Sequence, residues 1–355
     1  MANVRPNIFS FAKKELSQDA FLAWLITWAH PDNKEHDPRL HECAQDFVRQ
    51  LLGSFAIEAR LEIDGVWVDL QWNKIDVCVE VYSRIKNYLI VIENKVDSGE
   101  HSNQLLRYKD IAQTWCGDKS FELHCIYLKT GNEPLDSLNK TEAIGYRLFS
   151  RKHMLALVRK YENIENNILT DFRINLENIE ESLQMFTTKP IGKDWNKNDW
   201  IGLFSLLDEK QIITRWHYVS NPAGGFQNAL LNWHEWNNVF VYAQIEEGRL
   251  CYKISFDPED AKVDLLNLNL NEIQDEWQNI LLSGSKVHAN ETVQAIKRPN
   301  RYLHQGKWRT IAVVDRKDWL GEEGGIVDID RISYNLNAHK KFIQDCLKIT
   351  SAKTL

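Results

Sequence analysis

Runs of apolar residues in the first half of the chain predict a β-sheet. Three short runs, 56–63, 66–70 and 74–82, follow one another, and the last alternates apolar with polar positions, as in a strand with one buried face. Residues 88–96 are apolar on both faces almost to the end of the run, which is typical of a central strand. Another buried strand is predicted over 121–129.

Helical patterns surround these strands. An aromatic-rich helix is predicted over 15–29, and two arrangements of its start are open: Ser17 caps it and leaves Glu15 just outside, or Glu15 and Asp19 lie one turn apart on one face. A favourable charge in the first helical turn is a sufficient explanation of Asp19. Further helices are predicted at 39–52, after the turn at 97–99, at 150–164 and at 169–185. This order of elements predicts an α/β sandwich around a mixed sheet.

The chain changes character between residues 187 and 200, where Pro190 and Gly192 stand among Lys, Asp and Asn residues. We expect a domain boundary there, which gives the domains 1–186 and 187–355. The second domain contains eight of the thirteen tryptophans. Its pattern predicts an α+β fold, with a hairpin of 239–246 and 249–256, a helix at 271–282, a strand at 308–314 and a closing helix at 332–348.

The composition is that of a globular protein. A length of 355 residues favours two domains over one core, and contents of 43% hydrophobic and 26% charged residues are not those of a disordered chain. No apolar run approaches the roughly 20 residues of a membrane span, and the amino terminus lacks the apolar core of a signal peptide. The six cysteines form no CxxC pair. We therefore expect a cytosolic, reduced chain without a zinc site.

Three charged residues stand near the ends of two predicted strands. Asp76 lies at the start of the alternating run, and Glu93 and Lys95 lie at the end of the central one. Side chains two positions apart in a strand share a face, so Glu93 and Lys95 point the same way. Two carboxylates can bind a hard cation such as Mg²⁺, which can activate water and neutralise phosphate charge. The simpler alternative is a solvated strand-end ion pair, with Asp76 as an edge charge that discourages aggregation.

Several short segments accompany these three residues in a fixed order. They are 15–17 followed by 21–25, 74–76, 91–95, 104–108, 126–131 and Tyr146. Together they resemble the motifs of the PD-(D/E)xK nuclease superfamily, most closely its branch of uncharacterised bacterial and phage-defence nucleases. The resemblance covers about residues 9 to 186, and the string Val-Ile-Glu-Asn-Lys is its strongest part. One departure is Ile75, which stands where the family has its nominal proline.

The resemblance implies a restriction-endonuclease-like α/β fold, a mixed sheet flanked by helices, with a C-terminal α+β domain. It also implies a Mg²⁺ or Mn²⁺ cofactor. Asp76 becomes the main metal ligand and Glu93 the second, aided by the backbone carbonyl of Asn94. Lys95 becomes the catalytic lysine, and Glu15 completes the metal shell.

The helix after the central strand carries two more candidates. By resemblance, Gln104 and Tyr108 position phosphate or order the site. A helix face packed on the sheet explains both residues equally well.

The function implied by the resemblance is that of a metal-dependent nuclease in bacterial defence against phage or foreign DNA. The expected partner is nucleic acid, DNA rather than RNA, with no membrane, and a homodimer would suit cleavage of both strands. The second domain would then serve specificity, regulation or oligomerisation. The alternative from another class is a catalytically silent module that keeps the fold and binds nucleic acid or assembles.

A local excess of basic residues occurs in the second domain, although the net charge of the chain is −7. Residues 286–309 contain a single acid, Glu291, with Tyr302 and Trp308 interleaved. Cations neutralise phosphates and aromatic rings stack on bases, so we predict a nucleic-acid contact here. A solvated loop with core aromatics is the alternative, and an unchanged salt dependence of DNA binding after exchange of these cations for glutamate would favour it. The predicted contacts are Lys297, Arg298, Arg301, Lys307 and Arg309.

Overall fold

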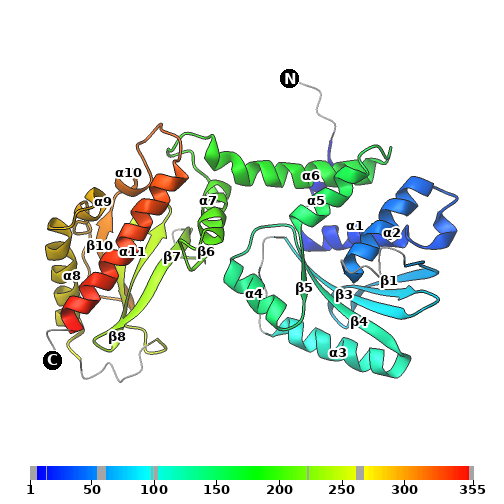
Figure 1. The fold of residues 1–355 in the computed structure, drawn as a ribbon, viewed down its shortest axis with the longest axis horizontal. Coiled ribbons are helices and arrows are strands. Elements are labelled where there is room, and N and C mark those ends of the chain that lie inside the picture. Colours follow the sequence, from blue (N-terminus) through cyan, green and yellow to red (C-terminus); the bar gives the residue numbers. More distant parts are fainter. Residues whose placement is uncertain are drawn as a thin grey trace. The chain divides into compact units, whose positions relative to one another are not determined.

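The chain forms two compact units, Met1–Glu181 and Ser182–Leu355, which are described separately (Figure 1). The structure is a computed structural model. It describes residues 6–12, 14–53, 61–96, 99, 103–221, 224–260 and 268–351. Most of the strand predicted at 56–63 lies outside these residues, and residues 61–63 belong to no strand.

The first unit is built on a five-stranded mixed sheet in the order β1-β2-β3-β4-β5. The first three strands pair antiparallel, and β4 and β5 add parallel to β3. The strands are β1 (Gly65–Trp72), β2 (Ile75–Tyr82), β3 (Asn87–Lys95), β4 (Phe121–Lys129) and β5 (Arg147–Ser150). The predicted central strand is therefore confirmed as β3, which is buried along almost its whole length.

Helices cover both faces of this sheet (Figure 1). They are α1 (Glu15–Thr27), α2 (Pro38–Leu52), α3 (Gln104–Lys119), α4 (Leu135–Ala143), α5 (Arg151–Lys160) and α6 (Asn167–Gln184). The sequence pattern did not predict α4, which is mostly polar, or β5, which has only four residues. The proposed Ser17 cap is wrong, because α1 begins at Glu15 with Lys14 at its N-cap position.

Two hydrophobic cores result from the strict alternation of side chains on the central strand. Ile90 and Ile92 of β3 pack into a core shared with α1, α2, α5 and α6. Leu89 and Val91 point the other way, into a smaller core under α3. A central strand covered on both faces must be apolar on both faces. The same alternation determines the face of the sheet on which each residue at the end of β3 lies.

The second unit contains a five-stranded antiparallel sheet in the order β10-β9-β8-β7-β6. The strands are β6 (Arg215–Val219), β7 (Phe226–Trp236), β8 (Val239–Glu246), β9 (Arg249–Ser255) and β10 (Trp308–Val314). The predicted hairpin is confirmed as β8 and β9, and Glu247 and Gly248 both adopt positive φ in its two-residue turn. The sequence pattern did not predict β6 or β7, and β7 has an irregular register at Leu230 and Asn232.

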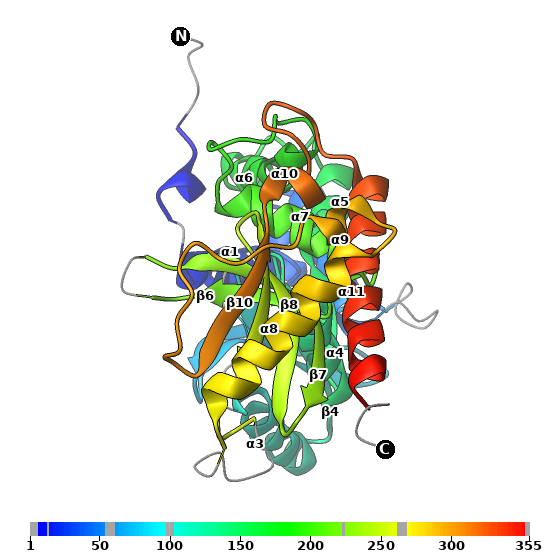
Figure 2. The same ribbon diagram turned by 90° about the vertical axis from the view of Figure 1, so that its left-hand side faces the viewer.

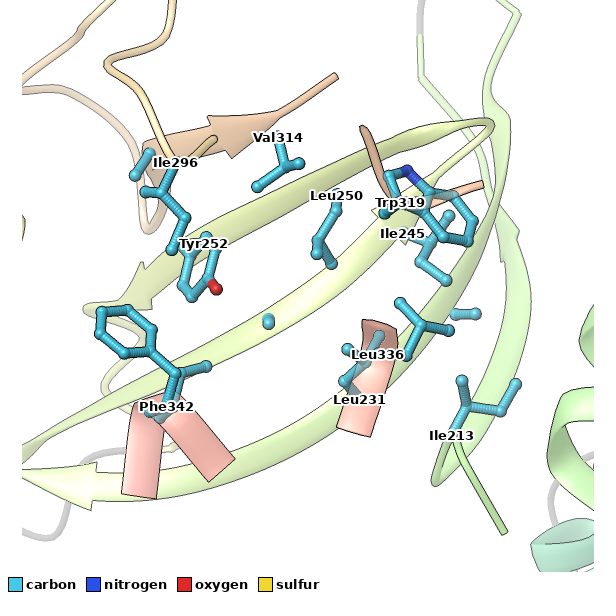
Figure 3. Close-up of a cluster of buried hydrophobic side chains, with 14 of the residues drawn as sticks. Ile213, Leu231, Ile245, Leu250, Tyr252, Ile296, Val314, Trp319, Leu336 and Phe342 are labelled. Carbon is cyan, nitrogen blue, oxygen red and sulfur yellow. The ribbon is translucent and has the colours of Figure 1, made fainter. Parts of the chain in front are cut away.

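Helices and one sheet face enclose a single core in this unit. The helices are α7 (Lys197–Glu209), α8 (Leu270–Lys286), α9 (Glu291–Gln294), α10 (Arg316–Trp319) and α11 (Ile329–Ser351). Figure 2 shows α8 and α11 next to each other in front of the strands. Figure 3 shows Leu231, Ile245 and Tyr252 of the sheet against Leu336 and Phe342 of α11. The predicted closing helix is confirmed as α11.

All six cysteines lie in described segments, are buried and are not in disulfides. None of the helices in the described ranges has the length and hydropathy that crossing a membrane requires.

Helix α7 packs closely against the preceding segment that contains Leu183 and Phe186, and a substitution at Gly202 tests this contact. A Cβ atom there would lie 1.9 Å from the carbonyl oxygen of Leu183 and 2.8 Å from a ring carbon of Phe186. Because backbone must move to accept it, Gly202→Ala is expected to lower the free energy of unfolding by about 1–3 kcal/mol. Tryptophan fluorescence in urea measures this. The matched control is Gly117→Ala on α3, where no described heavy atom lies within 4 Å of the added Cβ; it should be neutral or gain up to about 1 kcal/mol.

Candidate active site

Charged residues of β2 and β3 meet where β3 ends. A two-residue turn with positive φ at Asn73 and Lys74 places Asp76 second in β2. The pairing of Val77 with Ile92 makes Asp76 and Glu93 the next positions in register. Cys78 and Val91, which lie two positions from Asp76 and Glu93 on their strands, pack under α3, so the two carboxylates share that face of the sheet.

Each of these carboxylates is held by protein donors. The backbone N–H of Asn94 donates to Asp76 Oδ2 at 3.0 Å. Lys95 Nζ lies 2.6 Å from Glu93 Oε1, and Gln104 Nε2 donates to the same oxygen at 3.0 Å. The structure thus brings the predicted acids and the predicted lysine together, with Glu93 only 1% and Lys95 only 7% exposed.

Helix α1 adds two acids from the other side of β3. The side chain of Asn94 points toward α1, and its Nδ2 donates to Asp19 Oδ1 at 2.7 Å and to the backbone oxygen of Glu15 at 3.2 Å. Glu15 Oε1 accepts from the N–H of Val96 at 3.2 Å. Glu15 therefore lies beside the strand end, as predicted, but it is Asp19 whose carboxylate is buried there.

Burial raises the pKa of the carboxyl groups in this cluster. Burial and the neighbouring charge of Asp76 raise the pKa of Asp19 and of Glu93 to about 7. Burial also raises the pKa of Asp76, although the Asn94 N–H and Lys95 act in the opposite direction. Burial disfavours the charged form of Lys95, but the hydrogen bond and the charge of Glu93 outweigh it and raise the pKa of Lys95. Asp19 and Glu93 therefore keep their protons up to a pH of about 7, while the lysine stays charged.

The donor set of this cluster fits a divalent cation. No donor among the described residues reaches Asp19 Oδ2 or Glu93 Oε2, although both atoms are buried. A buried oxygen without a partner is costly, and a cation would supply the partner. No three His, Cys, Asp or Glu side chains of the described segments are already gathered into a metal cage. Mg²⁺ does not require one, because it is commonly held by one or two carboxylates and several waters.

The two candidates on α3 occupy different positions. Gln104, the first residue of the helix, reaches Glu93 and also donates to the hydroxyl of Tyr108 at 2.9 Å. Tyr108 is buried in the core between α3 and the sheet. Tyr108 is therefore part of the helix face that packs on the sheet, whereas Gln104 contacts the acidic cluster directly.

Two residues of this region were missed or undervalued in the sequence. Asp19 was interpreted as a helix charge, yet it is 2% exposed and bound to Asn94; its spacing of four from Glu15 was the available signal. Gln18 is buried beside it and bonds Asn94 as well. No pattern in a single sequence marks a buried glutamine.

The structure of the second unit argues against one of the five predicted nucleic-acid contacts, Arg309. Arg309 is buried, and its guanidinium donates to Asn271 and Gln274 and to the backbone of Gly306. Its prediction as a nucleic-acid contact conflicts with this position, because the donors are already used in packing.

The other four predicted contacts lie on the surface: Lys297, Arg298, Arg301 and Lys307. Lys297 is paired with Asp315, and Lys307 is paired with Asp257 at 3.1 Å. These acids reduce the local positive charge at Lys297 and Lys307, and Asp275 lies within electrostatic reach of Arg298. A nucleic-acid contact of these four cations stays a prediction.

Comparison with known protein families identifies the family to which the first unit belongs. The family model of the PD-(D/E)XK nuclease superfamily matches residues 6–186, just over half of the chain. The chain belongs to this superfamily, and the resemblance in the sequence is confirmed. Neither a curated protein nor a solved structure matches the chain. Family membership indicates nuclease chemistry and hence a nucleic acid as substrate.

The raised pKa of Asp19 predicts a particular dependence of stability on pH. Its pKa is about 7 in the folded protein and 3.8 ordinarily, so the folded state binds this proton more tightly than the unfolded state does. The free energy of unfolding of the metal-free protein should therefore fall as the pH rises from about 4 to about 7. Asp19→Asn removes the contribution of Asp19 to this dependence, and that of Glu93, which has the same sign, remains. The variant should stabilise the metal-free protein at pH 8 by roughly 1–3 kcal/mol, with little effect at pH 4.

Urea unfolding at the two pH values measures the effect of Asp19→Asn. Asp69→Asn, at an exposed position of β1, is the matched control and should change the free energy of unfolding by less than about 0.5 kcal/mol. Equal behaviour of the two variants at pH 8 would contradict the electrostatic account.

Proposed function

We propose that this protein is a Mg²⁺- or Mn²⁺-dependent nuclease that hydrolyses phosphodiester bonds of DNA. The observation that carries the proposal is the meeting of Asp76, Glu93 and Lys95 on one face at a buried strand end. A solvated ion pair would not need burial, and an edge charge against aggregation would not receive a backbone N–H from the central strand. Membership in a nuclease superfamily supports the same interpretation.

Asp76 and Glu93 would hold the cation, together with the backbone carbonyl of Asn94. Asp19 stands at hydrogen-bond distance from the Asn94 amide and is a better candidate than Glu15 for the remaining acidic group. When bound, the cation supplies an activated water and offsets the charge of the phosphate.

Two side chains of the protein, Lys95 and Gln104, would have further roles in the reaction. In the metal-free protein Lys95 is engaged by Glu93. Once the cation shares the charge of Glu93, the ammonium group of Lys95 can donate to the attacking water or to a phosphate oxygen. Gln104 keeps the Glu93 carboxylate oriented through its amide.

DNA as substrate and defence against phage or foreign DNA as setting rest on the resemblance to the defence branch of the family. The chemistry of the site suits RNA equally. We assign specificity, regulation or oligomerisation to residues 187–355, and a cytoplasmic homodimer is the form that suits cleavage of two strands.

Cleavage assays with site variants test the proposal. Plasmid and linear DNA are incubated with the wild type, Asp76→Ala and Lys95→Ala in Mg²⁺ or Mn²⁺. The wild type should cut, and loss of a ligand or of the lysine should reduce the rate by at least about 100-fold, since each acts on the transition state.

Asp69→Ala, an exposed acid on the neighbouring strand, is the control and should cut like the wild type. Cleavage of RNA alone would correct the substrate. Inert wild-type protein that also binds no Mn²⁺ in calorimetry would support the silent module instead, and equal cutting by all variants would place the site elsewhere.

A further inference from the structure

A chain of buried polar side chains lies behind the acidic cluster. Gln18 comes from α1, Asn94 from β3, and Thr130 directly follows β4; none is more than 6% exposed. Gln18 Nε2 donates to Asn94 Oδ1 at 2.5 Å, and Thr130 Oγ1 donates to Gln18 Oε1 at 3.0 Å. We call these three residues the amide relay.

The partners of the amide relay allow only one orientation of each amide. The backbone carbonyl of Glu15 can only accept, as can the Asp19 carboxylate when it is ionised, so Asn94 turns its NH₂ group toward them. Asn94 Oδ1 then needs a donor, which is the NH₂ group of Gln18. With that NH₂ group facing Asn94, the oxygen of Gln18 faces Thr130, and the hydroxyl of Thr130 supplies the donor that this oxygen needs.

The orientation of Asn94 has consequences for the acids. Its backbone N–H holds Asp76, and its side chain holds Asp19. If the amide reversed, its oxygen would face the Glu15 carbonyl and the ionised Asp19 carboxylate of the metal-bound state, and three acceptors would meet without a proton. Thr130 also ties the neighbouring strand to the site, because its N–H donates to the backbone oxygen of Lys95 at 3.1 Å.

We propose that Gln18 is a positioning residue of the metal site: through the side chain of Asn94 it fixes the carboxylate of Asp19 in the arrangement that receives the cation, while the backbone N–H of Asn94 holds Asp76. This inference rests on the proposed function. It assigns Gln18 no contact with substrate, and it makes Thr130 the donor that satisfies the oxygen of Gln18. A Gln18 that merely filled the core would affect stability and leave the affinity for metal unchanged.

Metal binding without DNA separates the two roles. Mn²⁺ is titrated into the full-length protein by calorimetry, and kcat and KM for DNA cleavage are measured in parallel. Gln18→Leu keeps the volume and removes both hydrogen bonds, so the Kd for Mn²⁺ should rise about 10-fold or more and kcat should fall about 10- to 100-fold, the usual cost of losing an outer-sphere partner. KM for DNA should stay within about two-fold, since the relay touches no substrate.

A second pair of variants keeps the test independent of the folding of Gln18→Leu. Thr130→Val removes the hydroxyl donor and should weaken Mn²⁺ binding by about three- to ten-fold, while Thr130→Ser retains the donor and should restore the wild-type Kd. Gln45→Leu on α2 is the matched control. Its amide donates to the backbone oxygen of Ala29 and accepts from Arg49, outside the relay, and its Kd for Mn²⁺ should equal that of the wild type.

Wild-type Mn²⁺ affinity and kcat in folded Thr130→Val and Gln18→Leu would overturn the inference. So would an equal loss in Gln45→Leu, which would indicate general destabilisation. Wild-type protein that neither binds Mn²⁺ nor cuts nucleic acid would overturn the proposed function and this inference with it. The two failures are thus told apart by the wild type.

Discussion

The crowding of acidic side chains at a buried strand end is the constraint on which the rest of the site depends. Asp19 and Glu93 are buried, Asp76 is half-buried and close enough to raise the pKa of both, and Lys95 is the cation paired to Glu93. Like charges in a poorly solvated place raise the pKa of the acids and store free energy in the ionised state. A divalent cation relieves this repulsion, so the same arrangement that costs stability provides affinity for metal.

The fold supplies the means to hold such a cluster. The central strand β3 is apolar on both faces, and cores on each side keep it fixed. At the end of β3, strand β2 and helix α1 both come within reach of a single residue, Asn94. That residue bonds Asp76 with its backbone and Asp19 with its side chain. These hydrogen bonds from a residue of the rigid sheet hold the two carboxylates in place, as a preorganised site requires.

The sequence was sufficient for the features that repeat along an element. Period-two alternation identified β2, the apolar run identified β3, and the Glu-x-Lys spacing put Glu93 and Lys95 on one face. It was insufficient where a role depends on a contact distant in the chain. Nothing local distinguishes the buried Asp19 from an exposed helix acid, or Arg309, which packs against Asn271 and Gln274, from a cation on the surface.

The elements missed by the sequence follow the same logic. The short strand β5 is stabilised by its parallel partner β4 more than by its own pattern, and β7 carries a register irregularity that interrupts its alternation. Helix α1 begins at Glu15, with Lys14 at its N-cap position, and Ser17 lies within its first turn. This start places Glu15 and Asp19 beside β3, a contact that is distant in the sequence.

A crystal structure of the protein grown with Mn²⁺ tests the central claim most directly, because the anomalous signal locates the ion without any assumption about activity. The account predicts an anomalous peak between the carboxylates of Asp76 and Glu93, with Lys95 moved away from Glu93. Crystals at neutral or higher pH that show no ion there and retain the ion pair of Glu93 and Lys95 would contradict it.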